Sequence, residues 1–315
     1  MFAIRCLGVS LAFFLLVYVV FSVAVVSGWR QVRRVGNRLS ARRLATLLFI
    51  LRSLPCAAAV LITLGFVVPS FLLLEPRVVA EPIGEIPLTL GACCVALFAG
   101  GAWNAIAAQM RTSRTVAGWL QGASAASGCD PVPLFRIRPS SPALTVSGWR
   151  QPRVLLSNAA AALLNQQELE SALRHEIAHV RRRDNLKKLM FRFCGFPGMA
   201  GLEAGWSEAA EMAADDAAVS NGGEALDLAS ALIKLSRFAP VHGATLTTGL
   251  VEDSGSGLNA RIARLVSWEE RRVASSRSLF PWYLAPTFAA CILSMVVIYG
   301  GALSRVHDLT EWLVR

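Results

Sequence analysis

The segment at residues 165–185, NQQELESALRHEIAHVRRRDN, predicts the helix around which the rest of the chain is organised. Asn165 can cap its start, and Glu168 stands at the third helical position, where its carboxylate can accept a hydrogen bond from the cap residue's amide. Arginines at 181–183 place positive charge near the negative end of the helix. Apolar residues recur at helical spacing and form the predicted buried face: Leu169, Ala172, Leu173, Ile177 and Val180.

Residues 175–179 of this helix read HEIAH. Residues four apart share a helix face, so His175 and His179 can direct their imidazoles at one cation. Glu176 lies beside that face and can reach a water on the cation without binding the ion. Two imidazoles suit zinc, which in catalytic sites takes three protein ligands and lowers the pKa of a bound water to about 7. The spacing therefore favours a hydrolytic zinc site, although so short a motif also arises by chance on solvated helices.

A third ligand is expected from the helix that the pattern predicts at residues 207–219. Glu208, Glu211 and Asp215 share one face of it. We predict that Glu211 binds the metal. Asp215, one turn later, would accept a hydrogen bond from the far nitrogen of a ligating imidazole. Glu208 and Asp216 remain alternative ligands, and a solvated acidic helix is the alternative interpretation.

The composition indicates a membrane protein. Of the 315 residues, 54% are hydrophobic and only 17% are charged, and the mean hydropathy is +0.50. The net charge of +10 could suggest nucleic acid, but apolar stretches flank the Arg-rich segment, so no direct nucleic-acid partner is expected. Seven cysteines without CxxC spacing predict neither a disulfide framework nor a cysteine metal site.

Four apolar stretches predict transmembrane helices, at residues 6–28, 44–74, 88–110 and 278–304. The first could instead be a cleaved signal peptide, but it exceeds the usual apolar length of about 7 to 15 residues. An Arg-rich, acid-free segment at 30–43 predicts a cytoplasmic loop. The amino terminus and residues 75–87 would then lie outside and residues 111–277 in the cytoplasm, leaving a short tail at 305–315.

The predicted cytoplasmic region is of mixed α+β type. Strands are expected at residues 134–138, 143–146 and 154–156, before a short helix at 157–164. After the metal helix come a predicted loop at 195–205 and the acidic helix. Further elements are a helix at 224–238, a loop at 240–257 and a helix at 258–274.

The sequence HEIAHVRRRDN followed by EMAADDAAV resembles the BlaR/MecR family of integral-membrane zinc metallopeptidases, whose site layout is related to that of the HtpX and CAAX-prenyl peptidases. The resemblance implies a mainly α membrane protein with four transmembrane helices, and a cytoplasmic α+β gluzincin-type zinc peptidase domain inserted between the third and fourth. It implies His175, His179 and Glu211 as Zn2+ ligands and Glu176 as the catalytic base. It further implies a protein or peptide substrate, a cleft lined by residues 143–156, and a place in a bacterial inner membrane.

The β-lactam-sensing members carry a penicillin-binding domain after the last span. This sequence stops at Arg315, so sensing by that route is not expected. The expected function is zinc-dependent endopeptidase activity in signal transduction, cutting a cytoplasmic or membrane-proximal protein such as a transcriptional repressor, or the chain itself. Alternatives are an HtpX-like quality-control protease, and a non-catalytic signalling protein with structural zinc, for which Cys194 is the nearby thiol. His242 is a weak candidate oxyanion donor, and a homo-oligomer remains open.

Overall fold

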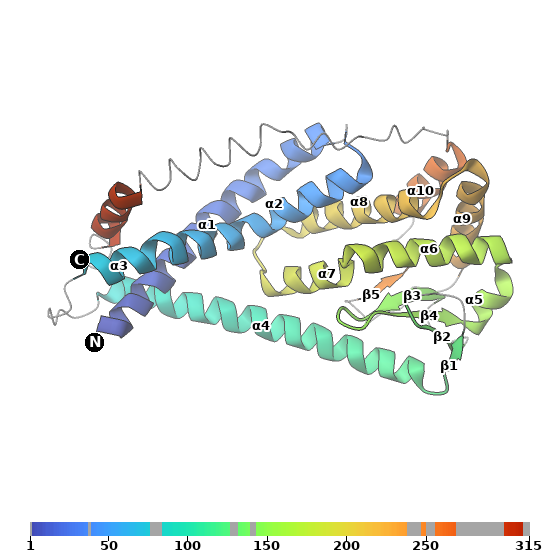
Figure 1. Ribbon diagram of the computed structural model, residues 1–315, viewed down its shortest axis with the longest axis horizontal. Helices are drawn as coiled ribbons and strands as arrows, with labels where there is room; N and C mark the ends of the chain where they lie inside the picture. Colours follow the sequence, from blue (N-terminus) through green and yellow to red (C-terminus); the bar gives the residue numbers. More distant parts are fainter. Residues whose placement is uncertain are drawn as a thin grey trace. The chain divides into compact units, whose positions relative to one another are not determined.

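The computed structural model describes residues 2–36, 39–75, 84–126, 132–138, 143–237, 247–249, 256–268 and 299–310 (Figure 1). This part of the chain is mostly helical with one small sheet, as predicted. It forms two compact units. The first comprises Met1–Trp29, Leu51–Gly100 and Arg272–Arg315, and the second comprises Arg30–Ile50 and Gly101–Arg271.

Three helical segments are long and apolar enough to cross a membrane, and they match the first three predicted spans: Phe2–Arg34, Ala41–Leu74 and Glu85–Leu120. The second continues through Pro55 and a π-helical turn. Of the fourth predicted span, 278–304, only residues 299–304 are described, and they belong to a helix at 299–310. The elements are α1 (Phe2–Gly36), α2 (Ala41–Ile62), η1 (Thr63–Val67), α3 (Val68–Leu74) and α4 (Glu85–Leu120).

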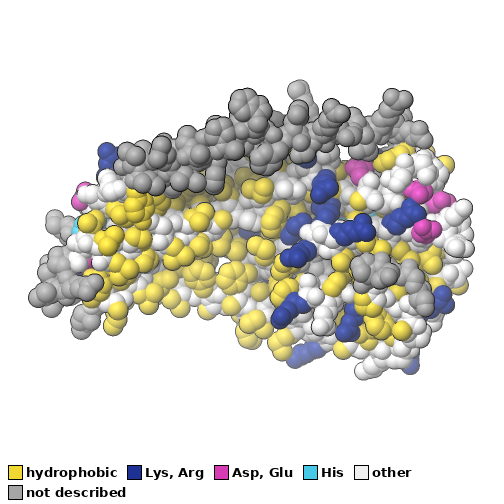
Figure 2. All heavy atoms as spheres, viewed as in Figure 1, with side chains coloured by type: hydrophobic (Ala, Val, Ile, Leu, Met, Phe, Trp, Pro, Cys, Tyr) yellow, Lys and Arg dark blue, Asp and Glu magenta, His cyan; other side chains and the backbone are white. Residues whose placement is uncertain are grey.

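The surface of the first unit suits a lipid environment. Large aliphatic side chains such as Leu7, Leu61 and Leu73 are exposed, and Figure 2 shows hydrophobic atoms over most of the visible face of this unit, whereas Lys and Arg gather over the second. Two polar contacts link its helices. Arg5 contacts Glu75 at 3.2 Å, and the Tyr299 hydroxyl donates to the Gly65 carbonyl at 2.7 Å.

The second unit contains a five-stranded sheet in the order β1-β2-β4-β3-β5. β2 and β4 are parallel, and the other neighbouring pairs are antiparallel. The three predicted strands are confirmed to within two residues. The short β1 and β5 were missed because each has only three residues, too few to show an alternating pattern, and Ala and Gly are poor strand formers. The strands are β1 (Ser124–Ala126), β2 (Leu134–Ile137), β3 (Leu144–Ser147), β4 (Arg153–Ser157) and β5 (Thr247–Gly249).

Helices pack on this sheet through one apolar core. Val146 and Leu156 of the sheet, Leu228 and Leu232 of α9, and Leu265 of α10 are almost fully buried in it. The helices are α5 (Asn158–Leu163), α6 (Gln166–Arg182), α7 (Asp184–Phe193), α8 (Ala200–Ala218), α9 (Gly222–Leu235) and α10 (Ser256–Val266).

Several helix boundaries differ from the sequence prediction; the helix expected over 258–274, for example, ends at Val266. The helix expected over 165–185 breaks at Arg183, whose φ of 54° is left-handed, and α7 starts directly afterwards. The loop expected over 195–205 is helical from Ala200. Its glycines are tolerated because the helix buries Leu202 and Trp206, so that tertiary packing outweighs propensity.

The predicted capping box of α6 is confirmed. The Asn165 side chain accepts from the Glu168 amide, and the Glu168 carboxylate accepts from the Asn165 amide, both at 2.8 Å. The buried Glu168 carboxylate also accepts from the Ser230 hydroxyl and the Lys234 ammonium of α9. Burial would raise the pKa of Glu168, but the hydrogen bonds from Lys234, Ser230 and the Asn165 amide outweigh it and lower that pKa. One carboxylate thus fixes both the start of α6 and its contact with α9.

We expect Glu168→Gln to lower the free energy of unfolding at neutral pH by about 1–3 kcal/mol, because buried donors lose a charged acceptor. Since folding lowers the pKa of Glu168, its contribution is complete above the unfolded value of about 4.3 and is lost as the pH falls through the folded value. The difference between wild type and variant should therefore shrink in acid. Thermal unfolding against pH measures it. Glu170→Gln, on the exposed side of α6, is the control, with an expected change below about 0.5 kcal/mol. Equal effects of the two changes would contradict the interpretation.

Candidate metal centre

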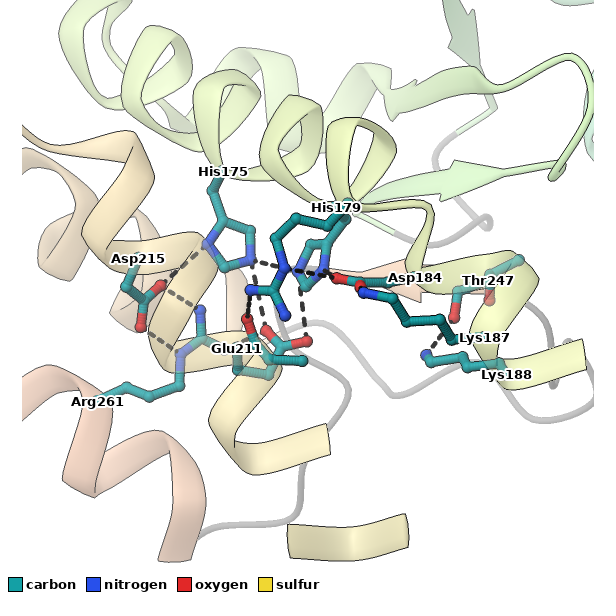
Figure 3. Close-up of polar contacts among 11 residues, drawn as sticks. His175, His179, Asp184, Lys187, Lys188, Glu211, Asp215, Thr247 and Arg261 are labelled. Atoms are coloured by element: carbon teal, nitrogen blue, oxygen red, sulfur yellow. Dashed lines mark hydrogen bonds and ion pairs between the residues drawn. The ribbon is translucent and has the colours of Figure 1, made fainter. Parts of the chain in front are cut away.

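Helices α6 and α8 bring the three predicted ligands together (Figure 3). Ligand atoms of His175, His179 and Glu211 all lie within 4.8 Å of one another, and all three residues are buried. The two Nε2 atoms are 3.1 Å apart. Glu211 Oε2 lies 3.4 Å from His175 Nε2, and Glu211 Oε1 lies 3.4 Å from His179 Nε2. Two imidazole nitrogens and a carboxylate in this arrangement could hold a metal ion.

Each imidazole has a carboxylate at its far nitrogen. Asp215 Oδ1 lies 2.9 Å from His175 Nδ1, in the place that the sequence predicted. Asp184 Oδ2 lies 2.8 Å from His179 Nδ1. Contacts of this kind fix the ring orientation and the tautomer that leaves Nε2 available. They direct both Nε2 atoms toward Glu211.

Asp184 was not among the predicted site residues. In a continuous helix, five residues turn the chain by about 140° from His179, which would take Asp184 off the metal-facing side. The left-handed Arg183 ends α6 and turns the chain, so that Asp184 comes back against His179. The only sequence signal was an aspartate immediately after a run of arginines.

Arg261 of α10 was also missed. Its Nε and Nη2 donate to the two oxygens of Asp215 at 2.8 and 2.7 Å, and Nη1 lies 3.0 Å from Glu211 Oε2. The side chain is buried. The signal that could have found it is its place beside the apolar face formed by Leu258, Ile262 and Leu265, where a buried arginine needs an acidic partner.

The alternative acidic ligands make other contacts. Glu208 pairs with Arg33 of α1 at 2.6 Å, and Asp216 pairs with Arg264 of α10. Both are partly exposed. Cys194 does not belong to the metal-binding group found within the described part of the chain. His242, the weak oxyanion candidate, falls outside the described residues.

Glu176, the predicted base, follows His175 on α6 and is completely buried. Its negative charge raises the pKa values of His179 and Arg261, so it acts directly on the cluster. A buried carboxylate in such surroundings is costly without nearby positive charge. A cation at the centre of the group would offset part of that cost.

The carboxylates set the protonation of the two imidazoles. Burial would lower the pKa of His179, but the charge of Glu211 and the contact with Asp184 outweigh it and raise that pKa to about 10. Burial would raise the pKa of Asp215, but the charge and hydrogen bonds of Arg261 hold it at about 2. The metal-free cluster therefore retains protons on its imidazoles, which a bound cation would replace.

The charge balance fits a divalent cation. Once both imidazoles are neutral, as metal binding requires, the described centre holds one buried cationic side chain, Arg261, and four buried carboxylates: Glu176, Asp184, Glu211 and Asp215. Two partly exposed cations, Arg182 and Lys187, lie beside Asp184 at 3.6 and 2.9 Å. The Glu211 carboxylate lies 3.4 Å from both Nε2 atoms, where a divalent ion would offset part of the negative charge.

Comparison of the chain with models of known protein families and with curated protein sequences gave no match.

We expect the purified full chain to bind about one equivalent of Zn2+, and His175→Ala or Glu211→Ala to abolish tight binding, because each removes one of three ligands. Glu208→Ala, on the same helix, is the control and should retain the metal. Binding should weaken as the pH falls, since the imidazoles must lose protons. Elemental analysis measures the zinc content, and calorimetry measures the affinity at each pH. Metal retained by Glu211→Ala and lost by Glu208→Ala would overturn the assignment.

We expect Arg261→Met to lower the stability of the metal-free protein by about 3–5 kcal/mol, because it leaves Glu211 and Asp215 buried without their positive partner. Arg264→Met, on the same helix, removes a partly exposed pair and should cost less than about 1 kcal/mol. Zn2+ should restore part of the loss in Arg261→Met by supplying positive charge to Glu211. Thermal unfolding with and without Zn2+ measures this, and equal losses in the two variants would argue against the role of Arg261.

Proposed function

We propose that this protein is a membrane-embedded zinc-dependent endopeptidase. The observation that carries the proposal is the convergence of His175, His179 and Glu211, with Glu176 on the same helix turn as the two imidazoles. Two imidazoles, one carboxylate and an adjacent second carboxylate form the donor set of a hydrolytic zinc site.

His175, His179 and Glu211 would hold the ion, and Asp215, Asp184 and Arg261 would keep them oriented. When bound there, zinc would supply Lewis-acid polarisation of the scissile carbonyl and lower the pKa of water. Three protein ligands leave a position open for that chemistry, whereas a structural zinc site is usually closed by a fourth.

Glu176 would act as the general base and then as the general acid. Its carboxylate would take a proton from the attacking water and deliver it to the nitrogen of the departing amine, as the C–N bond breaks. Its burial in the centre favours this transfer, because few bulk waters compete for the proton. A structural metal site has no need of this carboxylate.

The substrate would be a cytoplasmic or membrane-proximal protein. Helices α1, α2 and α4 run from the first unit into the second, so the candidate centre belongs to a unit that includes the ends of apolar helices. The resemblance to BlaR/MecR peptidases supports four spans, a bacterial inner membrane, an outside amino terminus and a cytoplasmic zinc domain. It also supports a repressor protein or the chain itself as substrate. A homo-oligomer is compatible with this function.

Two alternatives keep the same centre. An HtpX-like quality-control protease would use the same residues on misfolded membrane proteins. A non-catalytic signalling protein would need zinc only as a brace, and a zinc–sulfur signal in X-ray absorption would favour it. The lack of a cysteine from the metal-binding group in the described chain supports the catalytic alternative.

The test is Glu176→Gln, which should keep zinc but abolish cleavage, since an amide cannot take the proton. Membrane fractions from cells that express wild type or variant are compared for new protein termini. Termini that depend on Glu176 identify the substrate.

Glu170→Gln is the matched control, because Glu170 lies on the same helix in an exposed pair with Arg174. It should give the wild-type termini. Zinc content measured in parallel separates loss of chemistry from loss of metal. Wild-type cleavage by Glu176→Gln would refute the assignment of the base.

A further inference from the structure

A cavity of ≈ 260 Å³ lies between α4 and the turn that joins β3 to β4, and its lining includes none of His175, His179 and Glu211. Its walls include Thr112 of α4, Trp149 and Arg153 of the β3–β4 hairpin, and Asn185 of α7. At about 30 Å³ per water in the liquid, the volume corresponds to roughly nine waters, more than one ordered solvent molecule needs. The turn is fixed by Gly148, whose φ of +93° and close approach to the Gln151 carbonyl leave no room for a side chain.

Two residues that line the cavity each carry a buried polar atom without a hydrogen-bond partner in the described part of the chain: Asn185 Oδ1 and Thr112 Oγ1. Asn185 is 6% exposed and Thr112 is 4% exposed. The orientation of the Asn185 amide is set by its own bonds, because Nδ2 donates to the Val146 and Gly148 carbonyls at 3.3 Å. Unpaired buried groups are costly, and two at one cavity indicate a polar occupant.

The charge of the wall suits an anion. Arg153 is the only charged side chain among the described residues that line the cavity. A guanidinium beside an unpaired hydroxyl matches the two donors that a phosphate oxygen accepts, whereas the unpaired Asn185 Oδ1 requires a donor from the ligand. The ligand chemistry is therefore a phosphodiester that carries a hydroxyl group.

The position of the cavity indicates that this phosphodiester belongs to a membrane lipid. The apolar stretch of α4 ends near Met110, and the α4 residues of the cavity begin at Gln109, where Arg111 and Arg114 follow. On the opposite wall, Trp149 is 40% exposed, with the Arg150 guanidinium 5.7 Å from its ring centre. Indoles and arginines of this kind collect at the headgroup level of a bilayer, and basic pockets at that level bind lipid headgroups.

We propose that this cavity binds the headgroup of an anionic glycerol phospholipid of the phosphatidylglycerol type. Arg153 and the Thr112 hydroxyl donate to the phosphate, and Asn185 Oδ1 accepts from a headgroup hydroxyl. The proposal rests on α4 crossing the membrane and is independent of the hydrolytic chemistry. The lipid would brace the β3–β4 hairpin against α4.

The test uses the full chain in phosphatidylcholine nanodiscs with and without a fraction of phosphatidylglycerol. Phosphatidylglycerol should raise the unfolding midpoint by about 5 °C, because a ligand that binds only the folded state stabilises it. Thr112→Val should remove this increment without changing any charge, and without the lipid it should be at least as stable as wild type, since it removes an unpaired buried hydroxyl. Arg153→Gln should also remove the increment.

Thr115→Val is the matched control on α4, because the Thr115 hydroxyl already donates to the Arg111 carbonyl. It should retain the increment, as should Arg150→Gln. An equal increment in wild type and Thr112→Val would overturn the proposal in favour of general charge attraction. An equal increment with phosphatidylethanolamine would overturn the hydroxyl assignment. If soluble glycerophosphoglycerol alone stabilises the protein, the ligand is a free phosphodiester and not a lipid. If phosphatidylglycerol does not raise the unfolding midpoint at all, the cavity holds water and the proposal is wrong.

Discussion

The concentration of buried negative charge around two imidazoles is the constraint on which the second unit depends. Glu176, Asp184, Glu211 and Asp215 are withdrawn from water, which is tolerable only where hydrogen-bond donors and positive charge surround them. Four helices meet this requirement together: α6 supplies the imidazoles, α7 and α8 supply carboxylates, and α10 supplies Arg261. The packing of these helices and the charge compensation at the centre therefore depend on each other.

Much of this arrangement could be predicted from the sequence, because it depends on the spacing of residues along single helices. The capping box at Asn165, the spacing of His175 and His179, and the place of Glu211 and Asp215 on one helix face need only helical geometry. The apolar spans follow from composition in the same way. The three main strands were found through their β-branched and aliphatic residues.

The features that could not be predicted depend on contacts between residues far apart in the sequence. Arg261 lies far along the chain from the histidines, and its role follows only from the docking of α10 on α9. β5 pairs with β3 across a long separation, with residues too small and too few to signal a strand. The helical start of α8 likewise depends on burial of Leu202 and Trp206, which outweighs its glycines.

The left-handed residue at the end of α6 makes the centre sensitive to chain length at this point. Arg183 has φ 54°, a conformation that glycine adopts without strain, so the backbone and not the guanidinium matters there. Glycine or asparagine should be tolerated at this point, whereas β-branched residues should be disfavoured. An inserted or deleted residue would rotate Asp184 away from His179 and uncouple the two halves of the site. Alignment gaps between His179 and Asp184 should thus be rare among any functional relatives, even where the letters between them vary.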